Sequence, residues 1–210
     1  LNLERLLDYL PAKPQPQIEG FASTKLVVQG PLTAPSFSGR INLNRLVVAG
    51  IPMDTGRLVF HGDLNRIQIT QCELNSADFH IFAMGALERD NLKIDIGAGI
   101  TNLEGFRIQY NGNRLKGRLN LEGKLEGSFE QPVLTATLRG EEISFGDFNY
   151  PLLRANIRWA APQLEIYNTE LTGVDDSISA SGKIYTSKPV RFDLGLDVNN
   201  FKIRELLHLA

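Results

Sequence analysis

The fold is decided by a short stretch near the end of the sequence, Val190-Arg191-Phe192-Asp193-Leu194-Gly195-Leu196-Asp197-Val198. Its apolar side chains occupy every second position, and charged or small residues stand between them. Successive side chains of a β-strand point to opposite sides of the sheet, so a period of two predicts a strand with one apolar and one solvated face. We therefore expect a sheet that is apolar on one side.

The same alternation recurs along most of the chain. Gly, Asn, Asp and Pro interrupt it about every 8–12 residues, which indicates short turns and an antiparallel meander. We expect the apolar side chains of these strands to share one face and to line a groove. The groove-lining candidates are Ile41, Leu43, Leu58, Phe60, Ile67, Ile69, Phe79, Ile81, Leu92, Ile94, Ile96, Leu134, Leu138, Ile157, Trp159, Leu164, Ile166, Ile178, Ile184, Phe192, Leu194 and Leu196.

The sequence also contains an internal repeat. Most matching positions lie 97 residues apart, such as Pro35 and Pro132, Arg57 and Arg154, Leu74 and Leu171, or Gly85 and Gly182. Gly30 matches Gly123 at a spacing of 93, which predicts an insertion of four residues before Pro132. A tandem unit indicates a protein built by extension, which makes a long surface rather than a compact catalytic pocket.

Both units change the phase of their alternation at the same place. Apolar positions move from odd to even numbers after Ile69 in the first unit, and from even to odd after Ile166 in the second. An extra residue in one strand shifts the phase in this way. We therefore predict a β-bulge or sharp bend at the same strand of each unit.

The pattern divides the chain into four segments. Residues 1–20 form a short amphipathic helix and a Pro-rich linker, residues 21–110 and 111–200 form two β repeat units, and residues 201–210 begin another short helix. Because the chain ends as it begins, we expect it to be an interior stretch of a longer protein.

An apolar sheet face must be buried against something. The sheet can close into a barrel, fold over as a sandwich, or bend into a trough. A tandem repeat favours the trough, because a trough can be extended unit by unit. We therefore predict an all-β fold: an elongated, curved antiparallel sheet that forms a U-shaped apolar groove, with short helices at the ends.

Composition excludes several classes of protein. The net charge is −2 with both signs dispersed, so nothing indicates a nucleic-acid partner. Cys72 is the single cysteine, which excludes an internal disulfide. No run of about 18 apolar residues is present, so we expect no membrane-spanning helix.

The residues that could take part in catalysis or metal binding are better explained by structural roles. The three histidines, His61, His80 and His208, lack metal-ligand spacing, and the first two stand in the solvated phase of their strands. Cys72 is interpreted as a small, half-buried side chain rather than a reactive thiol. We expect no catalytic residue, no metal and no cofactor.

Paired and clustered residues lead to the same interpretation. Asp175-Asp176 follows Gly173 and is typical of a turn, with too few ligands for calcium. Glu141-Glu142 should point to opposite faces of a strand and cannot act as a catalytic pair. The segment Gly97-Ala98-Gly99 precedes no helix and does not match a phosphate-binding loop. The scattered arginines Arg154, Arg158 and Arg191 are interpreted as a solvated face.

Two segments carry a resemblance to a known superfamily: Leu26-Val27-Val28-Gln29-Gly30-Pro31-Leu32-Thr33-Ala34-Pro35-Ser36-Phe37-Ser38-Gly39 and Leu119-Asn120-Leu121-Glu122-Gly123-Lys124-Leu125-Glu126-Gly127. Their pattern of apolar-x-apolar-x-Gly-x-apolar, followed by Pro and Gly, resembles the repeats of the AsmA-like superfamily, especially its TamB (translocation and assembly module) branch. The leucine-rich ends, Asn2 to Leu7 and Phe201 to Leu207, look like the short elements of that superfamily. The C-terminal TamB signature is absent, so the resemblance is to an interior stretch.

The resemblance implies a function as well as a fold. Proteins of this superfamily are similar to bridge-like lipid carriers with a U-shaped β-groove, often called a β-taco. It implies a periplasmic, inner-membrane-anchored envelope protein that binds or conducts phospholipid acyl chains between the inner and outer membranes. It also implies a possible partner, an outer-membrane barrel protein of the TamA kind. The family has no catalytic residues to carry over.

Two alternatives remain open from the sequence. The protein could be an assembly scaffold whose edge strands pair with nascent outer-membrane strands by β-augmentation. It could also be a structural β-rod with a dry, closed interior and no ligand.

Overall fold

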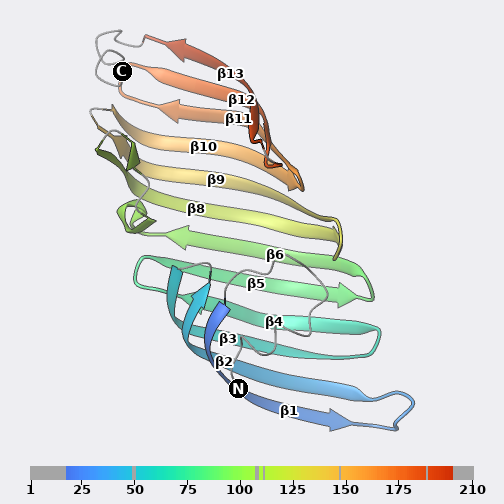
Figure 1. Cartoon of the computed structure of the whole chain (residues 1–210). Helices are drawn as coiled ribbons and strands as arrows, with labels where there is room; N and C mark the ends of the chain where they lie inside the picture. The colour runs from blue at the N-terminus through green and yellow to red at the C-terminus, as the bar shows by residue number, and fades with distance from the viewer. Residues whose placement is uncertain are drawn as a thin grey trace. The chain divides into compact units, whose positions relative to one another are not determined.

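The computed structural model describes residues 18–48, 51–106, 109–110, 112–146, 148–187 and 189–200 (Figure 1). Antiparallel β-strands make up nearly all of these residues, and the described part contains a single short 3-10 helix. The chain divides into two compact units, residues 1–96 and 97–210, which are described in turn.

The first unit is a meander in which strands adjacent in sequence are neighbours in the sheet. Connections of two to six residues join the strands, as the spacing of Gly, Asn, Asp and Pro predicts. The strands are β1 (Ile18–Gln29), β2 (Ser36–Val48), β3 (Ile51–Asp63), β4 (Arg66–Asn75), β5 (Phe79–Glu88) and β6 (Asn91–Ile100), the last of which ends in the second unit.

The second unit repeats this arrangement after a short connection. The connection contains the 3-10 helix η1 (Leu103–Phe106) and β7 (Gln109–Tyr110), which pairs with β8. The meander that follows consists of β8 (Asn113–Ser128), β9 (Pro132–Phe145), β10 (Phe148–Ala160), β11 (Gln163–Thr172), β12 (Ser177–Tyr185) and β13 (Arg191–Asn199).

The predicted fold class is confirmed: the protein is all-β, with antiparallel strands in open, curved sheets and almost no helix (Figure 1). This arrangement is consistent with a β-taco-like sheet. The helices predicted at the two ends fall on residues 1–17 and 201–210, which lie outside the described residues. Within the described ranges, no helix has the length and apolar character needed to cross a membrane.

The predicted phase switch is a bulge at equivalent positions of the two units. The register between β4 and β5 shifts between Ile69 and Cys72, and the register between β11 and β12 shifts between Ile166 and Thr169. The extra residue lets an apolar side chain on either side of the bulge return to the same face. The repeat is therefore a repeat of backbone irregularities as well as of residue types.

Other irregularities recur at the same spacing. Arg45 and Glu142 both adopt positive φ, 51° and 55°, although neither is a glycine. Gly30, which directly follows β1, and Gly127, near the end of β8, also share a positive φ, 97° and 102°. The sequence match of Gly30 with Gly123 is therefore wrong, and the four-residue insertion that it predicted is not needed.

The best-covered part of the second unit lies where η1 packs on the sheet. Leu103 of η1 is only 3% exposed and forms a cluster with Ile143 (8%) and Tyr150 (6%). Asn102 caps the start of η1, because its Oδ1 accepts a hydrogen bond from the Glu104 N–H at 3.0 Å. The partly buried residues around the cluster are Ile100, Leu115, Leu119, Phe148, Leu153, Leu171 and Ile178.

Candidate functional site: an apolar sheet face

The register of the second unit aligns apolar side chains in rows that run across its strands. Residues directly opposite each other on neighbouring strands share a face of the sheet. One row consists of Leu125, Leu134, Trp159, Leu164, Ile184 and Phe192. A second consists of Gly123, Ala136, Ile157, Ile166, Gly182 and Leu194, and a third of Leu119, Gly140, Leu153, Leu171, Ile178 and Val198. We call the surface formed by these rows the apolar face of the second unit.

The first unit has rows of the same kind. They are Ala22, Leu43, Gly56, Leu74 and Ile81; Thr24, Ile41, Leu58, Cys72 and Ala83; and Leu26, Gly39, Phe60, Ile69 and Gly85. We call this surface the apolar face of the first unit. A Cβ on Gly39 would lie 2.5 Å from Cζ of Phe60, so the glycine leaves room for the ring to cross the neighbouring strand. Phe60 also meets Phe37 edge to face, with ring centroids 6.3 Å apart.

The opposite side of the second unit carries charges. The row one position along from the Trp159 row consists of Lys124, Thr135, Arg158, Glu165, Lys183 and Asp193. Nζ of Lys183 lies 3.7 Å from Oε1 of Glu165 within this row. On the same side, Oγ1 of Thr137 donates a hydrogen bond to Oδ1 of Asn156 at 3.0 Å. The sheet of this unit therefore separates apolar and charged side chains sharply.

The strand register brings together the sequence-predicted groove residues that lie on β2 to β5 and on β9 to β13. Ile41 lies opposite Leu58, Phe60 opposite Ile69, and Trp159 opposite both Leu134 and Leu164. Most of the candidates are half-buried, and Phe79 and Leu92 are buried. The three on β13 differ, because Phe192, Leu194 and Leu196 are exposed to 67%, 42% and 66%. That these residues line a lipid groove stays a prediction.

The apolar face contains several residues that the sequence prediction did not include. Leu119, Leu121 and Leu125 on β8 follow strict alternation and belong to the face. Their period of two is visible in the sequence, although there it contributed only to the family resemblance. Leu74 and Leu171 follow the bulges, and the strand register places them in rows of the face.

The apolar face of the second unit is not uniform along its strands. The end that contains Leu119, Leu153 and Leu171 packs with the η1 cluster, to which the Trp159 row does not belong. The short helix η1 covers this end, because Leu103 buries its side chain there against Ile143 and Tyr150.

The residues weighed for chemistry have structural roles where the structure describes them. His61 and His80 are exposed, as predicted, and His208 lies outside the described residues. The backbone N–H of Gly173 donates to the Asp176 carbonyl oxygen at 2.8 Å, which confirms a turn. Oδ2 of Asp176 also accepts a hydrogen bond from Tyr150 Oη at 3.0 Å, so this carboxylate ties the turn to the buried cluster.

The two adjacent glutamates depart from the sequence prediction. Nη2 of Arg118 lies 3.5 Å from Oε2 of Glu141 and 3.2 Å from Oε1 of Glu142, so both carboxylates reach one guanidinium. The prediction that they point to opposite faces is wrong, because the positive φ of Glu142 breaks the alternation there. All three side chains are about half exposed or more, which is typical of a solvated ion cluster rather than an acid–base pair.

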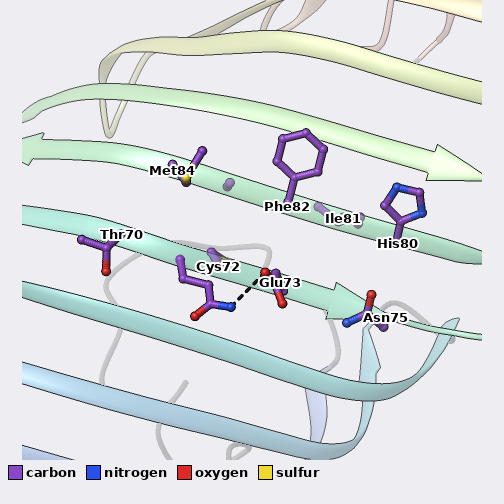
Figure 2. A pocket seen from close by; sticks show the side chains of 10 residues that line it. Thr70, Cys72, Glu73, Asn75, His80, Ile81, Phe82 and Met84 are labelled. Atoms are coloured by element: carbon purple, nitrogen blue, oxygen red, sulfur yellow. Dashed lines mark hydrogen bonds between the residues drawn. The ribbon is translucent and has the colours of Figure 1, made fainter.

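A depression of about 550 Å³ lies over β4 and β5 (Figure 2). The side chains of His80 and Phe82 extend from β5 on the same side, opposite Asn75 and Glu73 of β4. Phe82 is 42% exposed, and Nε2 of Gln71 donates to Oε1 of Glu73 at 2.9 Å. The register places these side chains on the face opposite the apolar one. In the sequence, the one sign of this depression is Phe82, an apolar residue that interrupts the alternation of β5.

Nothing in this depression forms a recognisable reaction centre. The described residues contain no group of three or more His, Cys, Asp or Glu side chains placed to hold a metal ion. Cys72 borders this depression, but the register places its side chain on the apolar face of the first unit, and its thiol is a poor nucleophile. Burial and, to a smaller extent, the neighbouring Glu73 carboxylate raise the pKa of Cys72 above its usual value.

The raised pKa of Cys72 gives a first testable prediction. The thiolate is the form that reacts with iodoacetamide, so at neutral pH alkylation should be slower than for a free cysteine. The rate should still be rising at a pH where that of free cysteine has levelled off, and Glu73→Gln should move the profile to lower pH. Rates measured by mass spectrometry between pH 7 and about pH 10 check this. A profile that coincides with that of free cysteine contradicts it.

Comparison of the chain with protein families, with curated proteins and with solved structures found no match. The resemblance to the AsmA-like superfamily consequently stays a prediction.

Proposed function

We propose that the apolar faces of the two units bind the acyl chains of phospholipids. The observation that carries this proposal is the set of apolar rows that cross the strands of each unit, backed in the second unit by a charged side. A methylene removed from water gains about 0.8 kcal/mol, so an acyl chain of about sixteen carbons gains on the order of 10 kcal/mol before ordering costs. This is enough to hold a lipid without any specific polar contact.

The composition of the rows also indicates that the surface does not select a particular lipid headgroup. The rows that contain Trp159, Ile157 and Leu153 include no charged side chain, so they offer no partner for a phosphate or an amine. A headgroup would stay at the solvated margin of the sheet, because burying an unpaired charge is costly. We therefore expect acyl-chain binding with low headgroup specificity.

The resemblance to AsmA-like proteins supports a setting for this activity. We propose that the chain is part of a periplasmic envelope protein in which such surfaces carry lipid between the inner and outer membranes. A TamA-like barrel protein in the outer membrane is the partner that this setting suggests. No enzymatic step is part of the proposal.

Trp159 provides a direct test, because it is the single tryptophan and lies in the middle of an apolar row. Bromine atoms on an acyl chain quench tryptophan fluorescence on contact. Titration with a dibrominated fatty acid, below its micelle concentration, should quench Trp159 saturably, and the unbrominated fatty acid should compete. Mass spectrometry of organic extracts should also find phospholipid that co-purifies with the protein.

A matched control moves the fluorescent tryptophan by one position along the strand. The double variant Trp159→Phe, Arg158→Trp places the tryptophan on the charged side of the same strand, where Arg158 is exposed. Quenching of this variant should be weak and should not saturate. Equal saturable quenching from both positions would refute binding by one face, and no quenching with no extracted lipid would favour the ligand-free rod.

A second pair of variants tests which face binds. Leu134 lies directly opposite Trp159 on the apolar face, and Thr135 is exposed on the charged side opposite Arg158. Leu134→Asp should weaken fatty-acid binding at least about tenfold, because it puts a carboxylate beside the acyl chain. Thr135→Asp should leave binding within about twofold of wild type. Circular dichroism should show that both variants keep their strands, and equal losses of affinity would contradict the assignment.

A further inference from the structure

A hollow of about 390 Å³ lies over β1, β2 and β3, which are neighbours in the first unit (Figure 1). Val27, Ser38 and His61 line it and stand directly opposite one another in a row across these strands. The rest of the lining consists of Gln29, Ser36, Phe37, Gly62 and Asp63. The register places the side chains of the row on the side of the sheet opposite the apolar face, so an occupant would not meet the acyl-chain surface.

Two positive charges border this hollow on the same side of the sheet. Lys25 and Arg40 stand directly opposite each other, two residues along their strands from Val27 and Ser38. Two residues of a strand span about 7 Å, so both long side chains can reach the hollow. Both are exposed, and among the described residues no ion pair joins either of them to a carboxylate. Like charges directly opposite are destabilising, so this pair costs stability unless the two cations share an anion.

Asp63 is the acidic residue of the lining, and the turn after β3 holds its carboxylate. Its Oδ1 accepts hydrogen bonds from the backbone N–H groups of Asn65 at 2.7 Å and Arg66 at 3.0 Å. These bonds partly neutralise the one negative charge of the lining. Ser38 and His61 are exposed, and within the described part of the chain no hydrogen bond of either side chain is recorded. The hollow therefore offers a hydroxyl and an imidazole beside the two cations.

We propose that this hollow binds a phosphate monoester with a small polar body, such as glycerol phosphate. A phosphate monoester carries about −1.5 to −2 charges at pH 7 and three acceptor oxygens. Arg40 matches two oxygens with its planar fork of N–H donors, and Lys25 supplies a point charge. Ser38 and His61 donate to the remaining oxygen or to the body. A carboxylate has one charge and two oxygens, so it would leave one of the two cations unmatched.

The phosphate monoester can come from two sources, which are a soluble ester and the headgroup of phosphatidic acid in a membrane. Both present the same group to Lys25 and Arg40. This inference does not rest on acyl-chain binding, because it concerns the opposite side of the sheet and a ligand that needs no acyl chain. Each of the two proposals can fail without the other.

Titration of the whole chain with glycerol phosphate, followed by heteronuclear NMR, tests the site. The amide signals of Ser38 and His61 should shift saturably, whereas uncharged glycerol should leave them unchanged. Arg40→Ala and Lys25→Ala should each weaken binding at least about fivefold, and Ser38→Ala about threefold. Lys93→Ala removes the same charge from an exposed position on β6, outside the hollow, and should keep binding within about twofold of wild type. All four positions are exposed, so the variants should fold.

Vesicles distinguish the two sources. Co-sedimentation with phosphatidic acid vesicles, beyond that with phosphatidylcholine vesicles and lost in Arg40→Ala, identifies the lipid headgroup. Binding of glycerol phosphate without such co-sedimentation identifies a soluble ester, and both results support the site.

Two results would overturn the proposal. One is the absence of saturable shifts up to about 10 mM glycerol phosphate, together with vesicle binding that does not depend on Arg40. The other is an equal loss of affinity in Lys93→Ala and Arg40→Ala, which would mean that the ligand responds only to overall charge.

Discussion

Replacing Gly182 with alanine is expected to destabilise the second unit by about 2–4 kcal/mol, a large share of the stability of a domain. Gly182 has φ of 145°, a conformation that L-residues rarely adopt, and a methyl group there would overlap the Asp193 carbonyl oxygen on β13. Gly85 in the first unit has φ of 152° and the same conflict with the Lys93 carbonyl oxygen. Gly85→Ala should therefore cost a similar amount.

The neighbouring strand offers a matched control for this prediction. Gly195 lies on β13, and the nearest heavy atom to a Cβ added there is the Ser181 carbonyl oxygen at 3.8 Å. Gly195→Ala should change the free energy of unfolding by less than about 1 kcal/mol. Urea unfolding followed by circular dichroism checks all three variants. If Gly182→Ala and Gly195→Ala unfold at the same urea concentration, the strained close approach is not a determinant of stability.

Leu103→Ala should destabilise the second unit by about 2–4 kcal/mol, the usual cost of emptying a buried leucine site. Leu103 is 3% exposed and is the residue through which η1 contacts Ile143 and Tyr150. Losing it removes the cover from one end of the apolar face. Unfolding followed by the fluorescence of Trp159, which lies outside this cluster, measures the effect on the whole unit.

Val174→Ala is the control for this second prediction. Val174 belongs to the same unit but is 91% exposed, so its truncation should change stability by no more than about 0.5 kcal/mol. A Leu103→Ala variant as stable as Val174→Ala would mean that η1 is only loosely attached. In that case the covered end of the apolar face would be accessible to ligand as well.

The fold class could be predicted from the sequence because its cause is local. The alternation of apolar and polar side chains determines which face of a strand is buried. This alternation can be read directly from segments such as the one around Leu194. Even the bulges after Ile69 and Ile166 left a trace, since an extra residue changes the parity of all apolar positions that follow. Such features need no knowledge of distant contacts.

What could not be predicted depends on backbone conformation and on contacts between distant residues. Nothing in the identity of Glu142 indicates a positive φ, because the residue is held there by its neighbours rather than by its own preference. The match of Gly30 with Gly123 failed for a related reason: several glycines recur nearby, and only the conformation of Gly127 distinguishes the true equivalent.

The candidate site was predictable in part. The apolar phase of each strand identified face residues such as Ile157 and Leu164, which the register aligns. The cover by Leu103 was not visible, since a four-residue 3-10 helix has no periodicity of its own. The exposure of Phe192, Leu194 and Leu196 was equally hidden, because the exposure of a strand depends on its position in the sheet rather than on its own sequence.

The coincidence of bulges and left-handed residues at a constant spacing has a consequence for how such a protein can change. Arg45 and Glu142 carry opposite charges on the same backbone conformation, so the duplicated units have kept their geometry while their surface chemistry diverged. Exchanging corresponding hairpins between the units is therefore expected to alter the surface chemistry while keeping the positions of the bulges.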